Sequence, residues 1–214
     1  MRRALLAVIG VCFVLYPVLR PWHDETTAAG AAAAMESPLW VASHSPAMLG
    51  FILLPAVPIA FAWHQRHGRK ALVVSAALLW LGVGLVLPYY GAETFALNAV
   101  ATLGGTDLVV VSDAIRLGAV QSIAFLLGLL LIGAGAVFTA VGLAKVHPWW
   151  FGVAFAAGFV LFAPQFFGSP AVRIAHGVLI AVGCVVLALS RGSADSGDSP
   201  RPRDRGSEAP SAPR

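Results

Sequence analysis

Arg173 and His176 lie three residues apart at the start of an apolar run that continues to Ser190. Residues with this spacing project from one face of a helix. An ionisable side chain inside a bilayer costs at least about 2.5 kcal/mol on insertion scales, so it needs a partner or water. The sequence therefore predicts a polar centre in this last apolar run, completed by residues from elsewhere in the chain.

Other polar side chains stand near the ends of the apolar runs, where they could complete this centre. Glu93 is the best-placed counter-ion for the arginines, because it follows an apolar run that closes on two tyrosines. We expect these side chains to form one outward-facing layer that locks the bundle or binds a small ligand. Its predicted members are His44, Tyr90, Glu93, Arg116, Arg173 and His176.

The chemistry of this layer has three interpretations. His44 and His176 could bind a metal ion, with Glu93 as a carboxylate ligand, or could hold a haem between facing helices. A histidine beside Arg and Glu could instead titrate near neutral pH and serve proton-coupled transport or sensing. In the third interpretation, the arginines pair with Glu93 or Asp113 and the histidines form hydrogen bonds between helices.

Few polar residues lie deeper in the apolar runs, which disfavours a conduction path through a single copy. Only Ser75, Ser122 and Thr139 are found there. The chain also has no His-Glu-x-x-His zinc pattern, no Gly-x-Ser-x-Gly elbow and no phosphate loop. We therefore expect a protein that is not an enzyme, with no catalytic residue assigned and no cofactor.

Composition sets the environment of the chain. Of its 214 residues, 58% are hydrophobic and only 11% are charged, which is typical of a protein in a lipid bilayer. The formal net charge of +4 does not indicate nucleic-acid binding, because the basic residues are scattered between apolar runs and in one tail. Cys12 and Cys184 fall within apolar runs and are interpreted as small buried side chains.

The apolar runs predict an all-α, polytopic transmembrane bundle of six spanning helices, each close to the length that a hydrocarbon core requires. The spans are expected at about 4–19, 41–63, 71–90, 117–144, 149–167 and 171–190. Pro55 and Pro58 should kink the second span. A cleavable signal peptide is the alternative for the first run, since Arg2 and Arg3 precede it.

The segments outside the spans complete the predicted domain organisation. Residues 1–190 form the transmembrane domain, and 91–116 form an outer loop with short helices at 94–103 and 108–117. Asp107 is expected to cap the second short helix. Residues 191–214, rich in Ser, Pro, Gly and Arg, are predicted to be a disordered cytoplasmic tail that could dock a partner.

Charge asymmetry orients the predicted bundle. Eleven of the fourteen Lys and Arg residues fall on one side, and Arg20, Arg116 and Arg173 fall on the other. The positive-inside rule therefore places both termini in the cytoplasm of a multi-pass plasma-membrane protein. The lipid bilayer is the expected partner, and a homo-oligomer is a further possibility.

Four short segments carry a resemblance to a known class of proteins. They are Tyr16-Pro-x-x-Arg-Pro21, Leu87-Pro-Tyr-Tyr-Gly-Ala-Glu93, Pro164-Gln-Phe-Phe-Gly168 and Ala171-Val-Arg-Ile-Ala-His-Gly177. With them the chain resembles small, uncharacterised six-span membrane proteins of high-GC Gram-positive (actinobacterial-type) bacteria. The resemblance covers most of residues 1–190 and implies a plasma-membrane location, but it transfers no activity and no catalytic residue.

Overall fold

The computed structural model describes residues 1–190, which form an all-α fold without strands; the predicted disordered tail, 191–214, lies outside the described residues. In chain order the elements are α1 (Arg2–Leu19), α2 (Ala28–Met35), α3 (Pro38–Leu53), α4 (Ala56–Ala62), α5 (Arg69–Gly91), the π-helical turn η1 (Ala92–Ala96), α6 (Leu97–Leu103), α7 (Leu108–Leu117), α8 (Ala119–Leu143), the 3₁₀ turn η2 (Trp149–Gly152), α9 (Val153–Val160), the 3₁₀ turn η3 (Pro164–Phe167) and α10 (Pro170–Ala188).

Five helical stretches in residues 1–190 are long and apolar enough to cross a membrane, whereas the sequence predicts six spans. The five stretches are Arg2–Leu19, Pro38–Ala62, Arg69–Leu103, Ala119–Leu143 and Pro170–Ala188. The expected span at 149–167 is not one regular helix, because α9 ends at Val160 and η3 begins at Pro164. The proline ring would clash with the carbonyl of Val160, which lies four residues earlier, so a regular helix cannot continue.

The expected outer loop at 91–116 is largely helical, which corrects the predicted end of the third span. Arg69–Leu103 is a single helical run of 35 residues, about 52 Å long at 1.5 Å per residue. Gly91 keeps right-handed helical geometry, with φ of −63° and ψ of −45°. The helix ends only where Gly104 and Gly105 adopt φ of +69° and +76°. This run is therefore longer than the thickness of a hydrocarbon core, about 30 Å.

Two local predictions are confirmed. Helix α7 spans the expected residues, and the Asp107 side chain caps it by accepting hydrogen bonds from the backbone N–H groups of Val109 and Val110. The second span is interrupted at its prolines, since α3 ends at Leu53 and Pro55 precedes α4. Sequence patterns thus identified the cap and the kink correctly.

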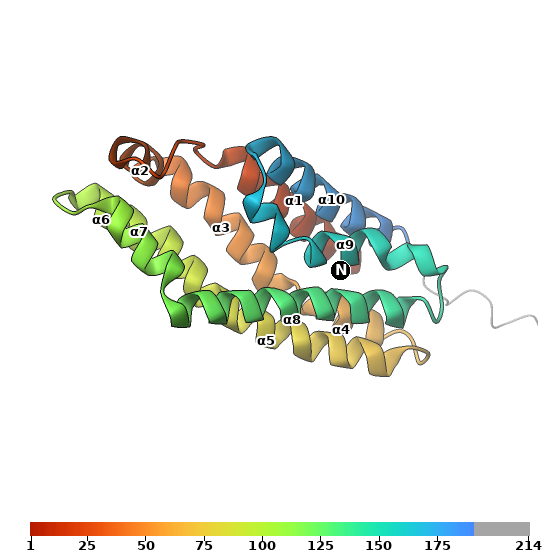
Figure 1. Ribbon diagram of the computed structural model, residues 1–214. Helices are drawn as coiled ribbons and strands as arrows, with labels where there is room; N and C mark the ends of the chain where they lie inside the picture. Colours follow the sequence, from red (N-terminus) through yellow and green to blue (C-terminus); the bar gives the residue numbers. More distant parts are fainter. Residues whose placement is uncertain (191–214) are drawn as a thin grey trace, which may run out of the picture.

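Close helix contacts build the bundle (Figure 1), in which α5 and α8 run side by side along one flank. Helices α1, α3, α4, α9 and α10 pack beside this pair. A Cβ added at Gly82 would lie 2.7 Å from the carbonyl oxygen of Gly128, and a Cβ at Gly128 would lie 2.8 Å from that of Gly82. Between α1, α3 and α9 the core is aromatic, with the Phe13 and Phe51 rings 5.0 Å apart.

The two ends of the bundle differ in character. At one end the Arg2 side chain donates to the carbonyl of Ser190 at 2.7 Å, so the start of α1 and the end of α10 lie together. At the other end, α2, α6 and α7 cluster (Figure 1) and share a small core with Trp40. This second end carries the charged groups described next.

Candidate functional site

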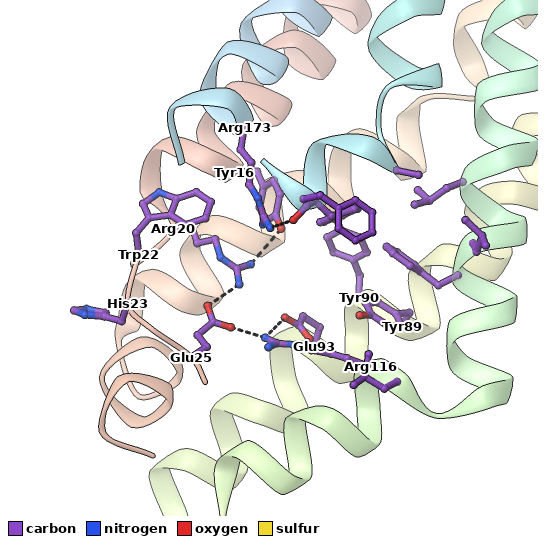
Figure 2. Close-up of a pocket in the computed structure, with 17 residues that line it drawn as sticks. Tyr16, Arg20, Trp22, His23, Glu25, Tyr89, Tyr90, Glu93, Arg116 and Arg173 are labelled. Carbon is purple, nitrogen blue, oxygen red and sulfur yellow. Dashed lines mark hydrogen bonds and ion pairs between the residues drawn. The ribbon is translucent and has the colours of Figure 1, made fainter. Parts of the chain in front are cut away.

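Four charged side chains form a continuous chain of ion pairs at this end (Figure 2). Arg20 contacts Glu25 at 2.8 Å, Arg116 contacts the other Glu25 oxygen at 2.7 Å, and Arg116 also contacts Glu93 at 2.6 Å. The Arg116–Glu93 pair is bidentate, since Nε donates to the second Glu93 oxygen at 3.0 Å. Charge-assisted, bidentate pairs of this kind are the strong and directional ones.

These side chains come from three parts of the fold: the connection between α1 and α2, the turn η1, and helix α7. Arg20 directly follows α1, Glu25 lies in the connection to α2, Glu93 lies in η1, and Arg116 is in the last turn of α7. A π-helical turn interrupts the regular hydrogen-bond ladder. Here the backbone carbonyl of Glu93 accepts a hydrogen bond from the Trp40 indole at 2.9 Å. The turn thereby ties α3 to the same layer.

His44 is fully buried within this layer and is held as a neutral ring. Its Nδ1 donates to the carbonyl of Trp40 at 2.6 Å, while its Nε2 lies 3.0 Å from Nη1 of Arg20. A guanidinium has only donors, so Nε2 must accept. Both ring nitrogens of His44 therefore have partners in the protein.

Aromatic rings surround the arginines. The Arg20 guanidinium lies 4.8 Å from the centre of the Trp40 ring and 5.4 Å from that of Trp22, and it donates to the Tyr16 hydroxyl at 3.2 Å. Trp22 also lies 5.3 Å from the guanidinium of Arg173 on α10. Cation–π contacts of this kind stabilise a desolvated arginine. Trp22 therefore links Arg20 to Arg173.

The Glu25 carboxyl is ionised despite its burial. Burial alone would raise its pKa, but the Arg20 and Arg116 guanidiniums outweigh this effect and hold the pKa of Glu25 below its ordinary value. Burial would likewise lower the pKa of Arg116, but hydrogen bonding to Glu93 and the charges of Glu93 and Glu25 raise that pKa instead. Both partners of this pair therefore carry charge at neutral pH.

The ion pairs form one wall of a cavity of about 570 Å³. This volume is within the range of small-molecule sites. Three guanidiniums and two carboxylates line it, which leaves a net charge of +1. Its charged and aromatic lining comprises Arg20, Arg116, Arg173, Glu25, Glu93, Tyr16, Trp22, His23, Tyr89, Tyr90, Phe125, Phe166 and Phe167.

Two polar groups of the lining lack strong partners. Arg173 donates only to the backbone carbonyls of Phe166 and Gly168, and among residues 1–190 no carboxylate lies within 4.0 Å of it. The Tyr90 hydroxyl, in a residue only 2% exposed, has no hydrogen-bond partner within that part of the chain. Figure 2 shows Arg173 approaching the site from a different direction than the four-charge chain.

The structure therefore brings together most, but not all, residues of the predicted layer. Tyr90, Glu93, Arg116 and Arg173 all line this one cavity, and His44 supports it through Arg20. His176 does not line it: its ring donates to the carbonyl of Gly158 at 2.7 Å and packs edge-on against Phe162. That carbonyl is free because the N–H of Phe162 donates to Phe159 instead, as happens where a helix ends.

This geometry gives no support to the metal and haem interpretations. His44 has both nitrogens engaged, and His176 bonds to a backbone carbonyl outside the cavity lining. Within residues 1–190, no three His, Cys, Asp or Glu side chains gather in a way that could hold a metal ion.

Sequence reasoning missed Arg20, Glu25 and the aromatic rings around them. Arg20 counted only as an outer basic residue, and Glu25 as one acidic residue in a polar connection. One signal was available: Arg20 directly follows an apolar run and stands two residues before Trp22 and five before Glu25. An arginine in that position needs a carboxylate or an aromatic face nearby.

Fold and site together define a helical protein of membrane type with a charged cavity at one end. Comparison with known protein families, with curated proteins and with solved structures finds no match.

Proposed function

We propose that this chain is a multi-pass plasma-membrane protein whose outward-facing cavity binds a small ligand carrying one negative charge. In this proposal the bundle crosses the membrane six times and both termini are cytoplasmic. The chain of ion pairs from Arg20 to Glu93 joins the outer ends of the helices, and Arg173 supplies the charge for the ligand.

The connection between α8 and α10 supports the sixth crossing. Helix α8 ends at Leu143, where Gly142 packs against Gly68 in the connection between α4 and α5. Helix α10 begins at Pro170, next to the charged cavity that Arg173 lines. Residues 149–167 must therefore pass from one end of the bundle to the other. The positive-inside rule supports a cytoplasmic position for the end that holds Arg2 and Arg66.

The observation that carries the ligand proposal is the surplus guanidinium. Arg20 and Arg116 already contact Glu25 and Glu93. Arg173 instead donates only to backbone carbonyls and packs against the Trp22 ring at the cavity wall. A buried or half-buried arginine without a carboxylate is costly unless an anion compensates it. The planar guanidinium suits a carboxylate or phosphate oxygen pair. One monovalent anion would neutralise the lining.

The test is calorimetric titration of the purified full-length protein with dibutyl phosphate, which carries one charge and short apolar arms. Uncharged tributyl phosphate serves as the comparison ligand. We expect dibutyl phosphate to bind and Arg173→Gln to weaken its binding by about tenfold or more, as expected for a charged hydrogen bond. Arg173→Lys keeps the charge but loses the paired N–H donors of the guanidinium, so it should retain part of the affinity.

The matched control is Arg66→Gln, which removes an exposed arginine near the opposite end of the bundle. This variant should bind dibutyl phosphate as the parent does. Equal binding of the charged and uncharged phosphates, or unchanged binding by Arg173→Gln, would overturn the proposal.

A further inference from the structure

The same cavity has a second, apolar region below its charged rim. The charged rim contains Arg116 and Arg173, whereas Phe125, Leu126 and Leu129 of α8 form a wall with no polar side chain. Ala163 and Phe166 face this wall from the segment that follows α9. A ligand that fills the whole cavity must therefore combine a small anionic group with a long apolar part.

The lower end of this apolar wall lies about one leaflet deep, counted from the start of α8. Leu129 lies ten residues beyond Ala119, the first residue of α8, which is about 15 Å along the helix axis at 1.5 Å per residue. A hydrocarbon core is about 30 Å thick, so one leaflet has about half that depth. The cavity thus descends from the level of the headgroups toward the middle of the membrane.

The cavity also reaches the outer surface of the bundle. Leu126 is 51% exposed and Phe167 is 94% exposed, although both residues line the cavity. In a membrane-spanning bundle, large apolar side chains exposed in this way face lipid chains rather than water. An apolar ligand could therefore enter sideways from the outer leaflet, between α8 and η3.

The charge of the rim selects the headgroup chemistry. A phosphatidylglycerol headgroup has a net charge of −1, from its phosphodiester, which equals in size the net charge of +1 on the cavity lining. In phosphatidylcholine the quaternary ammonium cancels the phosphodiester charge. The Arg173 guanidinium at the rim can donate to phosphate oxygens. Trp22 lies beside Arg173 at the same level, a position typical of aromatic residues at the membrane interface.

We propose that the cavity binds a phospholipid of the outer leaflet with a singly anionic headgroup, its phosphodiester at Arg173 and one acyl chain along α8. The proposal rests on the proposed function, because it names the ligand class of the same site. A soluble anion would use only the rim, whereas the lipid would use the rim and the apolar wall.

The test compares lipid binding by full-length variants in a neutral detergent, using native mass spectrometry to count bound lipids. The probes are phosphatidylglycerol, which has a net negative charge, and phosphatidylcholine, which has none. Leu126→Gln places a polar group in the apolar wall. Leu130→Gln is its matched control, because Leu130 is one turn further along the same helix, is 60% exposed and lies outside the cavity lining.

We expect the parent to retain phosphatidylglycerol about tenfold or more better than phosphatidylcholine. Both Arg173→Gln and Leu126→Gln should lose most of this preference, and Leu130→Gln should keep it. Leu126→Gln should still bind dibutyl phosphate, which also shows that the variant is folded.

Two results would overturn the lipid proposal but leave the proposed function standing. In the first, dibutyl phosphate binds through Arg173 but the parent retains both lipids equally. In the second, Leu126→Gln and Leu130→Gln retain the same preference for phosphatidylglycerol. If neither dibutyl phosphate nor phosphatidylglycerol binds, the proposed function fails and the lipid proposal fails with it.

Discussion

Replacing Glu93 with glutamine tests whether the chain of ion pairs holds the charged end of the bundle together. Both Glu93 oxygens accept hydrogen bonds from Arg116, at 2.6 Å and 3.0 Å. Glutamine keeps the shape of the side chain but has only one oxygen that can accept a hydrogen bond from Arg116. Its NH2 group is a donor and cannot pair with the guanidinium, which has only donors. The variant therefore removes one charge and one hydrogen-bond acceptor from a largely buried pair.

The size of the effect follows from burial. Breaking a fully buried ion pair costs about 3–5 kcal/mol, whereas an exposed pair is worth about 0–1 kcal/mol. The Glu93 side chain is 8% exposed and that of Arg116 is 21% exposed. In the parent, Arg116 also contacts Glu25 at 2.7 Å, and we expect the variant to keep this contact. We therefore expect Glu93→Gln to lower the free energy of unfolding by about 2–3 kcal/mol.

The assay is denaturant-induced unfolding in mixed detergent micelles, with Glu36→Gln as the control because Glu36 is exposed and forms no ion pair within residues 1–190. A double-mutant cycle with Arg116→Met should give a coupling energy of about 1–2 kcal/mol between the partners. The reasoning would be refuted if Glu93→Gln and Glu36→Gln lower the free energy of unfolding by amounts within about 0.5 kcal/mol of each other, or if Glu93 and Arg116 show no coupling.

Two further predictions concern pH and helix packing. The pKa of the Glu25 carboxyl is lowered in the fold, so its stabilisation is complete above the ordinary Glu pKa of about 4.3 and is lost as the pH falls through the folded-state pKa. Glu25→Gln should flatten the acid limb of an unfolding-midpoint-versus-pH profile, and an unchanged profile would contradict this. A Cβ at Gly82 would press on the backbone of α8, whereas nothing lies within 4 Å of a Cβ at Gly84. In the same unfolding assay, Gly82→Ala should cost about 1–3 kcal/mol while Gly84→Ala should be neutral or gain up to about 1 kcal/mol, and equal effects would argue against the close packing.

Local signals identified much of the fold from the sequence. Long apolar runs predicted the five helical stretches that are long and apolar enough to span a membrane. Asp107 after Gly104 and Gly105 predicted the start of α7. The continuation through Gly91 was missed because a single glycine in a helix costs only about 1 kcal/mol, which packing readily offsets. The turn at Pro164 was missed because the surrounding residues are as apolar as those of a span.

The site was predicted less completely, for a different reason. Glu93 and Arg116 stood out because they lie next to long apolar runs, and the structure pairs them. The role of Glu25 depends on how the connection between α1 and α2 folds back over the cavity, which no local pattern encodes. His176 was assigned to the layer from its depth along the helix, but the face that it occupies points to a free carbonyl of α9.

The most direct test of the central claim is an experimental structure of the protein with bound dibutyl phosphate. The proposed function predicts phosphate oxygens at about 2.7–2.9 Å from the guanidinium of Arg173, the usual length of a charge-assisted hydrogen bond. It also predicts that Arg20 and Arg116 keep their contacts with Glu25 and Glu93. A phosphate bound elsewhere, with the cavity beside Arg173 empty, would contradict the claim.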